Sequence, residues 1–498
     1  MLSILVGHSY FLRFDRKQWE RAKPYPPLAT LQTASALRDA GHRVTVFDAM
    51  LADGPEQFAR QLHEVAPQVV VLYEDNFNFL SKMCLEKMRG AACKMIAAGR
   101  RSGARVLVAG SDATDTPEVY LSAGAEVVLL GEGLTALSTL CERLDHQPRV
   151  ATADLVAGLS GIVCKKDGAL SRPRAANAFG SAPHPGMPAL DLIDVEKYRA
   201  MWRRAHGYFS LNMSASRGCS FRCNWCSKPI WGNQYLQRPA LEVAAEMAHL
   251  KRHFAPDHVW FADDIFGFRA DWVETFATAV SADGCGVPFT IQIRPDLISP
   301  RMARALREAG CREAWLGAES GSQRVLDEMD KGTSVAEILT ARERLRAEGI
   351  RVGFFIQLGY IGERLEDILA TRRLVEMAGP DDVGVSVSYP LPGTKFYERV
   401  KAQLGAKTHW QESDDLAMMF KGTYSTEFYR LVRDLIHAHI DVNQPVIRAD
   451  ALAYRTATQA IQERWDELIA TEQGYRLESA GLSLAAATAD SSLVAGIA

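Results

Sequence analysis

The stretch that decides the fold is "SASRGCSFRCNWCSKPIWG", residues 214–232, which places three cysteines within eight residues. Cys219, Cys223 and Cys226 follow the spacing Cys-x3-Cys-x2-Cys, and Trp225 stands directly before the last of them. The next cysteine along the chain, Cys285, is single. This grouping indicates a centre that takes three thiolates from one loop. The sequence on either side of the loop indicates which kind of protein holds it.

Length and composition describe a globular protein with several domains. The chain has 498 residues, of which 47% are hydrophobic and 23% charged, and this length predicts about three domains. The net charge of −3 gives no overall field that would attract nucleic acid or an anionic membrane. No apolar run is long enough to span a membrane, and no secretion signal is evident. We therefore expect a cytoplasmic protein whose cysteines are reduced thiols.

Residues 1–147 alternate short apolar segments with amphipathic ones. The five segments that we expect to form strands are 2–7, 43–49, 67–75, 104–112 and 125–133. Strands that alternate with helices over short loops predict a parallel sheet with helices on both faces, that is, an α/β domain of the Rossmann-like, flavodoxin-like kind. Sheets of this kind bind ligands at the carboxyl ends of their strands.

A different composition follows at residues 148–205, which are rich in proline, alanine and glycine and lack periodicity. We interpret them as a linker. The alternation returns in residues 206–400. The six strands expected there are 208–214, 258–263, 289–295, 313–319, 352–359 and 383–390. Six successive strand–helix units predict a partial (β/α)6 barrel, whose chemistry is expected at the carboxyl ends of the strands.

Residues 401–498 are expected to be a helical C-terminal domain with a disordered tail. The predicted helices cover 426–442 and 458–472. The tail, residues 480–498, consists of small and weakly polar residues, which is typical of frayed chain ends.

Three kinds of centre compete for the cysteine loop. A zinc site normally takes four ligands in paired clusters, and only single histidines, His206, His253 or His258, stand near enough to supply the fourth. A disulfide leaves one thiol over and does not suit a reducing compartment. Thiolates also hold iron–sulfur clusters. Three thiolates on a four-iron cluster leave one iron open to a substrate or cofactor, so this interpretation is favoured.

The motif formed by Cys219, Cys223, Trp225 and Cys226 resembles the signature of the radical S-adenosylmethionine (radical SAM) enzymes, and it follows the first of six strands as in that family. The resemblance covers about residues 206–400. It implies a 4Fe-4S cluster on the three cysteines, with SAM bound at the open iron. It also implies reductive cleavage of SAM to a 5′-deoxyadenosyl radical, which takes hydrogen from an unactivated carbon.

Residues at the ends of the later strands match the SAM-binding segments of the same family. Asp263 and Asp264, in "FADDIFG", stand where the family meets the ammonium group of SAM, a natural partner for a carboxylate. The other residues that the resemblance assigns to SAM are Trp225, near the adenine, with Arg294, Glu319, Ser320 and Gln357. Ordinary core packing is an equally good interpretation of Trp225.

The N-terminal segments 24–49 and 108–133 resemble the cobalamin-binding domain that precedes the barrel in one radical SAM subclass. The resemblance covers most of residues 1–145. The residues that it places near the corrin and its nucleotide tail are Ser111, Asp112, Thr114, Gly131, Glu132 and Gly133. Plain turn chemistry is the alternative interpretation of these residues.

One cobalamin signature is absent, namely Asp-x-His-x-x-Gly, whose histidine coordinates cobalt. His8 follows the first strand but lacks this spacing. We expect the loop after the third strand to face the lower side of the corrin instead, with Tyr73, Asn76 and Phe77 as candidates. A lower face without a strong donor favours release of a methyl group.

Two other N-terminal functions lack their motifs. Gly-x-Gly-x-x-Gly is missing after the first strand, which argues against a nicotinamide domain. A methylthiotransferase would hold a second cluster here, but only Cys84, Cys93 and Cys141 are present. Cys84 and Cys93 stand nine residues apart on an expected helix, which would place them on opposite faces.

The function that the resemblance implies is a cobalamin-dependent radical SAM methylase acting on an unactivated carbon of a small-molecule substrate. An external electron donor such as flavodoxin or ferredoxin is implied as well. One alternative is an enzyme with the same cofactors that closes a ring, oxidises or rearranges its substrate without methyl transfer. A second alternative is a non-catalytic corrinoid or iron–sulfur sensor. No basic patch with interleaved aromatic residues indicates a nucleic-acid substrate.

Overall fold

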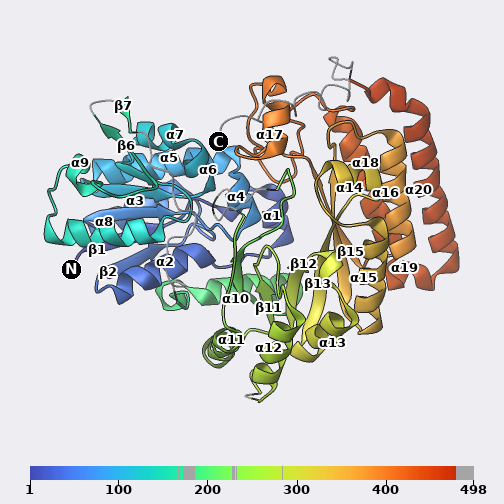
Figure 1. The fold of residues 1–498 in the computed structure, drawn as a ribbon, viewed down its shortest axis with the longest axis horizontal. Helices are drawn as coiled ribbons and strands as arrows, with labels where there is room; N and C mark the ends of the chain where they lie inside the picture. Colours follow the sequence, from blue (N-terminus) through green and yellow to red (C-terminus); the bar gives the residue numbers. More distant parts are fainter. Residues whose placement is uncertain (167–168, 172–185, 227–229, 231–232, 283, 478–498) are drawn as a thin grey trace, which may run out of the picture.

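The computed structural model describes residues 1–166, 169–171, 186–226, 230, 233–282 and 284–477. Two sheets and the helices that cover them form most of the molecule (Figure 1). Every strand expected from the alternating pattern is present, which confirms the predicted fold class. The segment 480–498, expected to be disordered, lies outside the described residues.

The first sheet has the strand order of a flavodoxin-like domain, with two further strands at one edge. Its strands, from one edge to the other, are β2 (Arg43–Phe47), β1 (Ser3–Gly7), β3 (Val69–Tyr73), β4 (Arg105–Ala109), β5 (Val127–Leu129), β6 (Ile162–Lys166) and β7 (Ala169–Leu170). The first five are parallel, whereas β6 and β7 run antiparallel to their neighbours. The five parallel strands are buried along almost their whole length, as expected of a sheet covered on both faces.

Helices cover this sheet on both faces. They are α1 (Arg16–Arg21), α2 (Leu28–Asp39), α3 (Pro55–Val65), α4 (Phe79–Met83), α5 (Glu86–Arg101), α6 (Ser111–Asp115), α7 (Pro117–Ala123), α8 (Leu134–His146) and α9 (Thr152–Leu155). Crossovers between parallel strands are right-handed, and the direction in which successive strands are added across the sheet reverses after β2. As a result, α2 covers one face of the sheet, while α3, α5 and α7 cover the other (Figure 1).

The segment 148–205, expected to be a linker, is more structured than its composition suggests. It contains β6 and β7, which extend the first sheet, and α10 (Val195–His206). The side chains of α10 bond to the N-terminal domain: the hydroxyl of Tyr198 donates to Asp48 at 2.7 Å, and the indole N–H of Trp202 donates to the carbonyl of Pro24 at 2.6 Å. Residues 172–185 lie outside the described part.

The second sheet is a parallel half-barrel whose strands lie side by side in chain order. They are β8 (Ser210–Met213), β11 (His258–Phe261), β12 (Phe289–Ile293), β13 (Cys311–Glu319), β14 (Arg351–Leu358) and β15 (Asp382–Val387). The helices of this part are α11 (Ala240–Phe254), α12 (Ala270–Ala282), α13 (Pro300–Ala309), α14 (Gln323–Glu328), α15 (Val335–Ala347) and α16 (Leu365–Ala378). A small ribbon, β9 (Ser216–Gly218) with β10 (Tyr235–Gln237), brackets the cysteine loop.

The C-terminal part is helical, as expected, and its last three helices lie along the barrel at the edge far from the first sheet (Figure 1). Its helices are α17 (Lys395–Val400), α18 (Thr426–Val442), α19 (Pro445–Ala449) and α20 (Ala451–Thr471). Between α17 and α18 the chain crosses back to the N-terminal domain. Among the residues described here, no helix combines the length and apolar character that a membrane crossing requires.

Two glycines differ in the space around them, and replacing each by alanine would measure how tightly these layers pack. A methyl group at Gly321, which follows β13, would overlap the backbone of Ala370 and lie 2.6 Å from the Cα of Thr371 in α16. We expect Gly321→Ala to lower the free energy of unfolding by about 1–3 kcal/mol. Gly90, exposed within α5, has no atom within 4 Å of such a methyl group. Gly90→Ala should raise stability by about 0.5–1 kcal/mol, and urea unfolding of both variants would measure the contrast.

Candidate functional site

The cysteine loop lies at the carboxyl end of β8, directly after β9. Cys219 is buried, and Cys223 and Cys226 are half-buried. Asn224 fastens the loop: its backbone N–H donates to the carbonyl of Met329 at 3.0 Å, and its side-chain amide donates to the carbonyl of Glu328 at 2.7 Å. The hydroxyl of Tyr360 donates to the Asn224 side-chain oxygen at 2.9 Å. The loop is thereby tied to the end of α14 and to the turn after β14.

The arrangement of donors separates the kinds of centre considered for this loop. Within the described ranges, no three histidine, cysteine, aspartate or glutamate side chains form a group that could hold a single metal ion. A four-iron cluster does not need such a group, because each thiolate binds a different iron and the sulfurs need not converge on one point. Three thiolates in one loop therefore fit an iron–sulfur cluster better than a single ion.

Trp225 packs against an apolar cluster beside the loop. The buried members of the cluster are Val325, Met329, Tyr360, Phe396, Val400 and Phe420. The indole nitrogen of Trp225 is buried and has no hydrogen-bond partner among the described residues. A buried indole N–H usually finds a partner, so this donor is available to a bound group.

The two neighbouring aspartates after β11 have different surroundings. Asp263 is buried and accepts hydrogen bonds from the backbone N–H of Ala215, at 3.0 Å, and from the hydroxyl of Ser216. Burial raises the pKa of Asp263 to about 7, although these hydrogen bonds lower it. Asp264 forms an ion pair at 2.7 Å with Lys82 of the N-terminal domain. Of the two aspartates, Asp264 is thus the one that already has a cationic partner in the chain.

The remaining residues assigned to SAM lie at the carboxyl ends of β12, β13 and β14. The guanidinium of Arg294 lies 3.7 Å from the sulfur of Cys223. Glu319 is buried, has a positive φ of 60°, and accepts from the ammonium of Lys331 at 2.7 Å. Ser320 lies 3.2 Å from the hydroxyl of Thr371, and Gln357 donates to Ser388 at 2.9 Å. Arg294 and Lys331 therefore lie beside the cysteine loop, whereas Ser320 and Gln357 bond to other parts of the barrel.

Lys331 is a residue of this site that the sequence did not reveal. Its ammonium is buried, and burial alone would lower its pKa, but the nearby Glu319 and Cys223 raise it. The lysine stands in the loop between α14 and α15, away from any strand end, so no strand–helix pattern marks it.

Polar atoms without partners gather at the carboxyl edge of the first sheet. The side-chain oxygens of Asn76, Ser81 and Ser111 and the Nδ1 of His8 are buried without a hydrogen-bond partner in the described part of the chain. Buried polar groups are normally satisfied, so this edge fits a ligand that carries many polar groups, such as the side chains and nucleotide tail of cobalamin. Phe77, from the same loop as Asn76, is buried beside them.

The predicted cobalamin residues at the ends of β4 and β5 hold one another in place. The hydroxyl of Tyr73 donates to the carbonyl of Glu132 at 2.6 Å. Thr114 accepts from the backbone N–H of Gly131 at 3.0 Å. Gly131 has a φ of 67°, and a methyl group there would lie 3.2 Å from the carbonyl of Ile230, so the backbone of the barrel approaches closely. The carboxylate of Glu132 pairs with Arg217 of β9, across the boundary between the two sheets.

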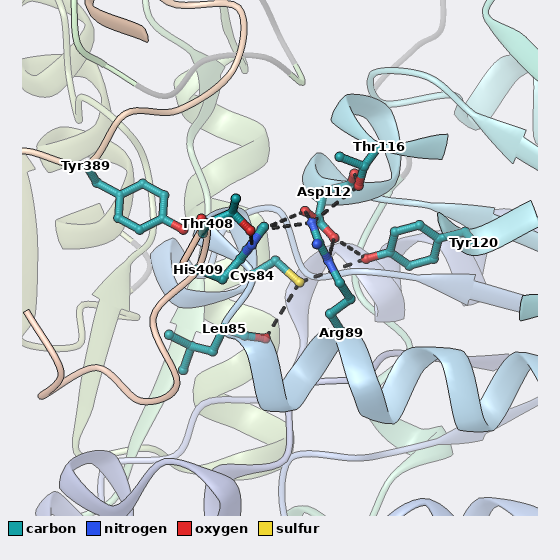
Figure 2. Close-up of polar contacts among 9 residues, drawn as sticks. All are labelled: Cys84, Leu85, Arg89, Asp112, Thr116, Tyr120, Tyr389, Thr408 and His409. Carbon is teal, nitrogen blue, oxygen red and sulfur yellow. Dashed lines mark hydrogen bonds and ion pairs between the residues drawn. The ribbon is translucent and has the colours of Figure 1, made fainter. Parts of the chain in front are cut away.

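Asp112 has a different environment from the one expected. Figure 2 shows its carboxylate surrounded by donors: Arg89 at 2.8 Å, the hydroxyl of Tyr120 at 2.6 Å and the Nε2 of His409 at 3.1 Å. Burial alone would raise the pKa of Asp112, but the hydrogen bonds from His409 and Arg89 hold it well below its ordinary value. The carboxylate is therefore occupied by the chain itself rather than open to a nucleotide tail.

Cys84 lies beside this group, at the break between α4 and α5, and not within one helix with Cys93 as expected. Its sulfur lies 3.9 Å from the hydroxyl of Tyr120 (Figure 2). Burial raises the pKa of the Cys84 thiol well above its ordinary value.

His409 belongs to a segment, residues 409–413, that we term the strap. Trp410 accepts from the backbone N–H of Glu86 at 2.7 Å, Glu412 pairs with Lys87 at 2.8 Å, and Ser413 donates to Asp15 at 2.9 Å. The strap thus joins the chain that leaves the barrel to α1, α5 and α6 of the N-terminal domain.

Comparison with known sequences gives a match to one family over part of the chain and to two relatives over most of the chain. Residues 213–375 match the Radical SAM superfamily. An uncharacterized methyltransferase of Pyrococcus horikoshii is 23% identical over 416 residues, which are 82% of this chain and 86% of that protein. A hopanoid C-3 methylase of Methylococcus capsulatus is 23% identical over 403 residues, 77% of this chain and 70% of that protein.

Two solved structures share the fold over most of the chain. The radical SAM methyltransferase TsrM from Kitasatospora setae, solved with cobalamin and a 4Fe-4S cluster bound, has a TM-score of 0.65 at 19% identity and covers 80% of this chain and 74% of its own. The cobalamin-dependent SAM radical enzyme OxsB, solved with aqua-cobalamin and SAM bound, has a TM-score of 0.70 at 15% identity and covers 94% and 72%.

The raised pKa of Asp263 makes a prediction about pH. The folded protein keeps a proton on this carboxyl from about pH 4 to about pH 7, whereas the unfolded chain does not, so the free energy of unfolding should fall as the pH rises through this range. Asp263→Asn removes the titration, and its stability should change less with pH. Urea unfolding at several pH values would measure this. Replacing the exposed Asp191 by asparagine should leave the wild-type slope, and an equal slope in the Asp263 variant would contradict the prediction.

The donors around Asp112 make a second prediction. Asp112→Asn leaves the half-buried Arg89 without its anionic partner, so we expect a loss of about 2–3 kcal/mol in the free energy of unfolding at pH 7. Asp414→Asn, at an exposed carboxylate just after the strap, should cost less than about 1 kcal/mol. Equal losses for the two variants in urea unfolding would show that Asp112 is an ordinary surface charge.

Proposed function

We propose that this chain, which contains a radical SAM domain and has the fold of the cobalamin-dependent radical SAM enzymes, is a radical SAM methyltransferase that uses cobalamin to methylate an unactivated carbon of a small molecule. The names of its relatives in the comparisons support methyl transfer. We further propose a cytoplasmic location, an external electron donor such as flavodoxin or ferredoxin, and the domain boundaries 1–147, 148–205, 206–400 and 401–498.

The observation that carries this proposal is that the carboxyl ends of both sheets meet. Lys82, in the segment after β3, pairs with Asp264, after β11. Glu132, after β5, pairs with Arg217, close to the cysteine loop. Ligands bind at the carboxyl ends of the strands in both kinds of sheet. Ligands of the two sheets would therefore face each other, as transfer between two cofactors and one substrate requires.

The residues proposed for each ligand follow from this arrangement. Cys219, Cys223 and Cys226 would hold a 4Fe-4S cluster, which supplies the electron that cleaves SAM. The unpartnered indole N–H of Trp225 and the carboxyl of Asp263 would contact SAM.

The proposed corrin site is the carboxyl edge of the first sheet, where the unpartnered oxygens of Asn76 and Ser111 lie. Asn76 and Phe77, in the loop after β3, would lie against the corrin, and no imidazole stands in this loop, residues 74–78. The imidazole of His8, whose Nδ1 has no partner among the described residues, stands at the same edge. The backbone of Gly131 and the hydroxyl of Tyr73 shape the neighbouring wall.

A second function has support from one observation. OxsB, a cobalamin-dependent SAM radical enzyme, shares the fold over a larger part of this chain than the methyltransferase TsrM does. Ring formation, oxidation or rearrangement of the substrate with the same cofactors is therefore the alternative. The mass of the product separates the two, because methylation adds one methylene unit.

The proposal predicts the outcome of reconstitution with iron and sulfide under anaerobic conditions. The wild-type protein should gain the absorbance of a four-iron cluster and, once reduced, convert SAM to 5′-deoxyadenosine. A variant with Cys219, Cys223 and Cys226 all replaced by alanine should do neither, because no thiolate remains in the loop. Cys93→Ala, on α5, is the matched control and should behave as wild type. A wild-type protein that binds cobalamin but never cleaves SAM would be a sensor and not an enzyme.

A further inference from the structure

We propose that Arg294 is a positioning residue for the iron–sulfur cluster: it holds Cys223 in place and makes the cluster easier to reduce. This inference rests on the proposed function, since it concerns a cluster on the three cysteines. It assigns Arg294 to the cluster and not to SAM, which the sequence resemblance had suggested.

The guanidinium of Arg294 has a partner for each of its nitrogens. Its Nε donates to Asp296 at 2.9 Å, and its Nη2 donates to Asp296 at 3.2 Å and to the carbonyl of Lys331 at 2.8 Å. Its Nη1 lies 3.7 Å from the sulfur of Cys223, within hydrogen-bond distance for sulfur. The side chain is only 4% exposed. Asp296 therefore fixes the plane of the guanidinium, and in this plane Nη1 faces the sulfur of Cys223.

The cysteine loop contacts Arg294 a second time. The ring of Phe221, midway between Cys219 and Cys223, lies against the guanidinium with 3.7 Å between the ring centre and Cζ. A cation placed over an aromatic ring at this distance is attracted to the ring face. One arginine thus contacts both the sulfur of a predicted ligand and the aromatic residue between two ligands, so it orders the segment that a cluster would need in place.

Positive charge beside the cysteine loop is the reason to expect that Arg294 makes the cluster easier to reduce. Lys331, whose ammonium is buried and paired with Glu319 at 2.7 Å, lies on the same side of the loop as Arg294, which donates to its carbonyl at 2.8 Å. Reduction adds one negative charge to a cluster, and nearby cations and N–H donors to its sulfurs favour the reduced form. Loss of the Arg294 charge and of its N–H···S contact should therefore lower the reduction potential.

A role in binding the carboxylate of SAM is the competing assignment. It would have to use the second N–H of Nη1, because the other four N–H groups of Arg294 bond to Asp296, Lys331 and Cys223. The two roles make different predictions. A SAM ligand changes the affinity for SAM and leaves the potential of the SAM-free cluster unchanged, whereas a positioning residue changes that potential before SAM is added.

The test compares Arg294→Gln, Arg294→Lys and Asp296→Asn with wild type after anaerobic reconstitution, without SAM. Redox titration followed by electron paramagnetic resonance measures the midpoint potential, and iron and sulfide analysis measures loading. We expect Arg294→Gln to shift the ratio of reduced to oxidised cluster by about tenfold at fixed potential, which is about 59 mV downward for one electron. Arg294→Lys keeps the charge but not the planar fork and should fall between Gln and wild type.

Asp296→Asn keeps the arginine and removes the anion that offsets its charge, so by the same charge argument it should shift the potential upward, and it gives a readout even if Arg294→Gln fails to load a cluster. Arg301→Gln, at an exposed arginine of α13 that pairs with Glu274, is the matched control and should keep the wild-type potential. Unchanged potentials in all variants of Arg294 and Asp296, with loaded clusters, would overturn the inference alone. A wild-type protein that takes up no four-iron cluster would instead overturn the proposed function.

Discussion

Two ion pairs set the relation between the halves of this protein. Lys82–Asp264 and Arg217–Glu132 both link a loop of the first sheet to a loop of the barrel, and in both pairs the cation is almost fully buried. Buried charges lose much of their attraction to desolvation, so such pairs contribute less to stability than their short distances suggest. Either charge without its partner would be costly, however. The pairs therefore select one relative position of the two sheets, the one in which both carboxyl edges face the same space.

The buried carboxyl groups at the two carboxyl edges, one in each sheet, have different partners and different pKa values. At the barrel, Asp263 accepts hydrogen bonds from neutral donors, and burial raises its pKa to about 7, so it can hold a proton near neutrality. At the first sheet, Asp112 stays ionised because Arg89 and His409 surround it. A carboxyl that can gain or lose a proton suits a position beside a charged ligand. A carboxylate that is locked as an anion suits a structural junction.

The sequence predicted well the features whose pattern lies within a few residues, and predicted poorly the features that depend on contacts between residues far apart in the chain. The alternating strands, the barrel order and the cysteine loop all carry their signal within a few residues. β6 and β7 were missed because they are short, antiparallel and set in a segment rich in proline and glycine. The environment of Asp112 could not be predicted, because His409 stands 297 residues further along the chain. Arg294 was found as a site residue, but its neighbour Lys331 carries no local pattern and emerges only from the folded chain.

The strap has a consequence for synthesis. Because the ribosome makes the N-terminal domain first and domains generally fold as units, Asp15 and Asp112 remain without Ser413 and His409 until nearly four hundred later residues have been translated for Asp15 and nearly three hundred for Asp112. During that interval the barrel is also incomplete, so the carboxyl edge of the first sheet faces solvent. A bulky macrocycle would meet the least obstruction in this nascent form, before the strap joins the barrel to the N-terminal domain.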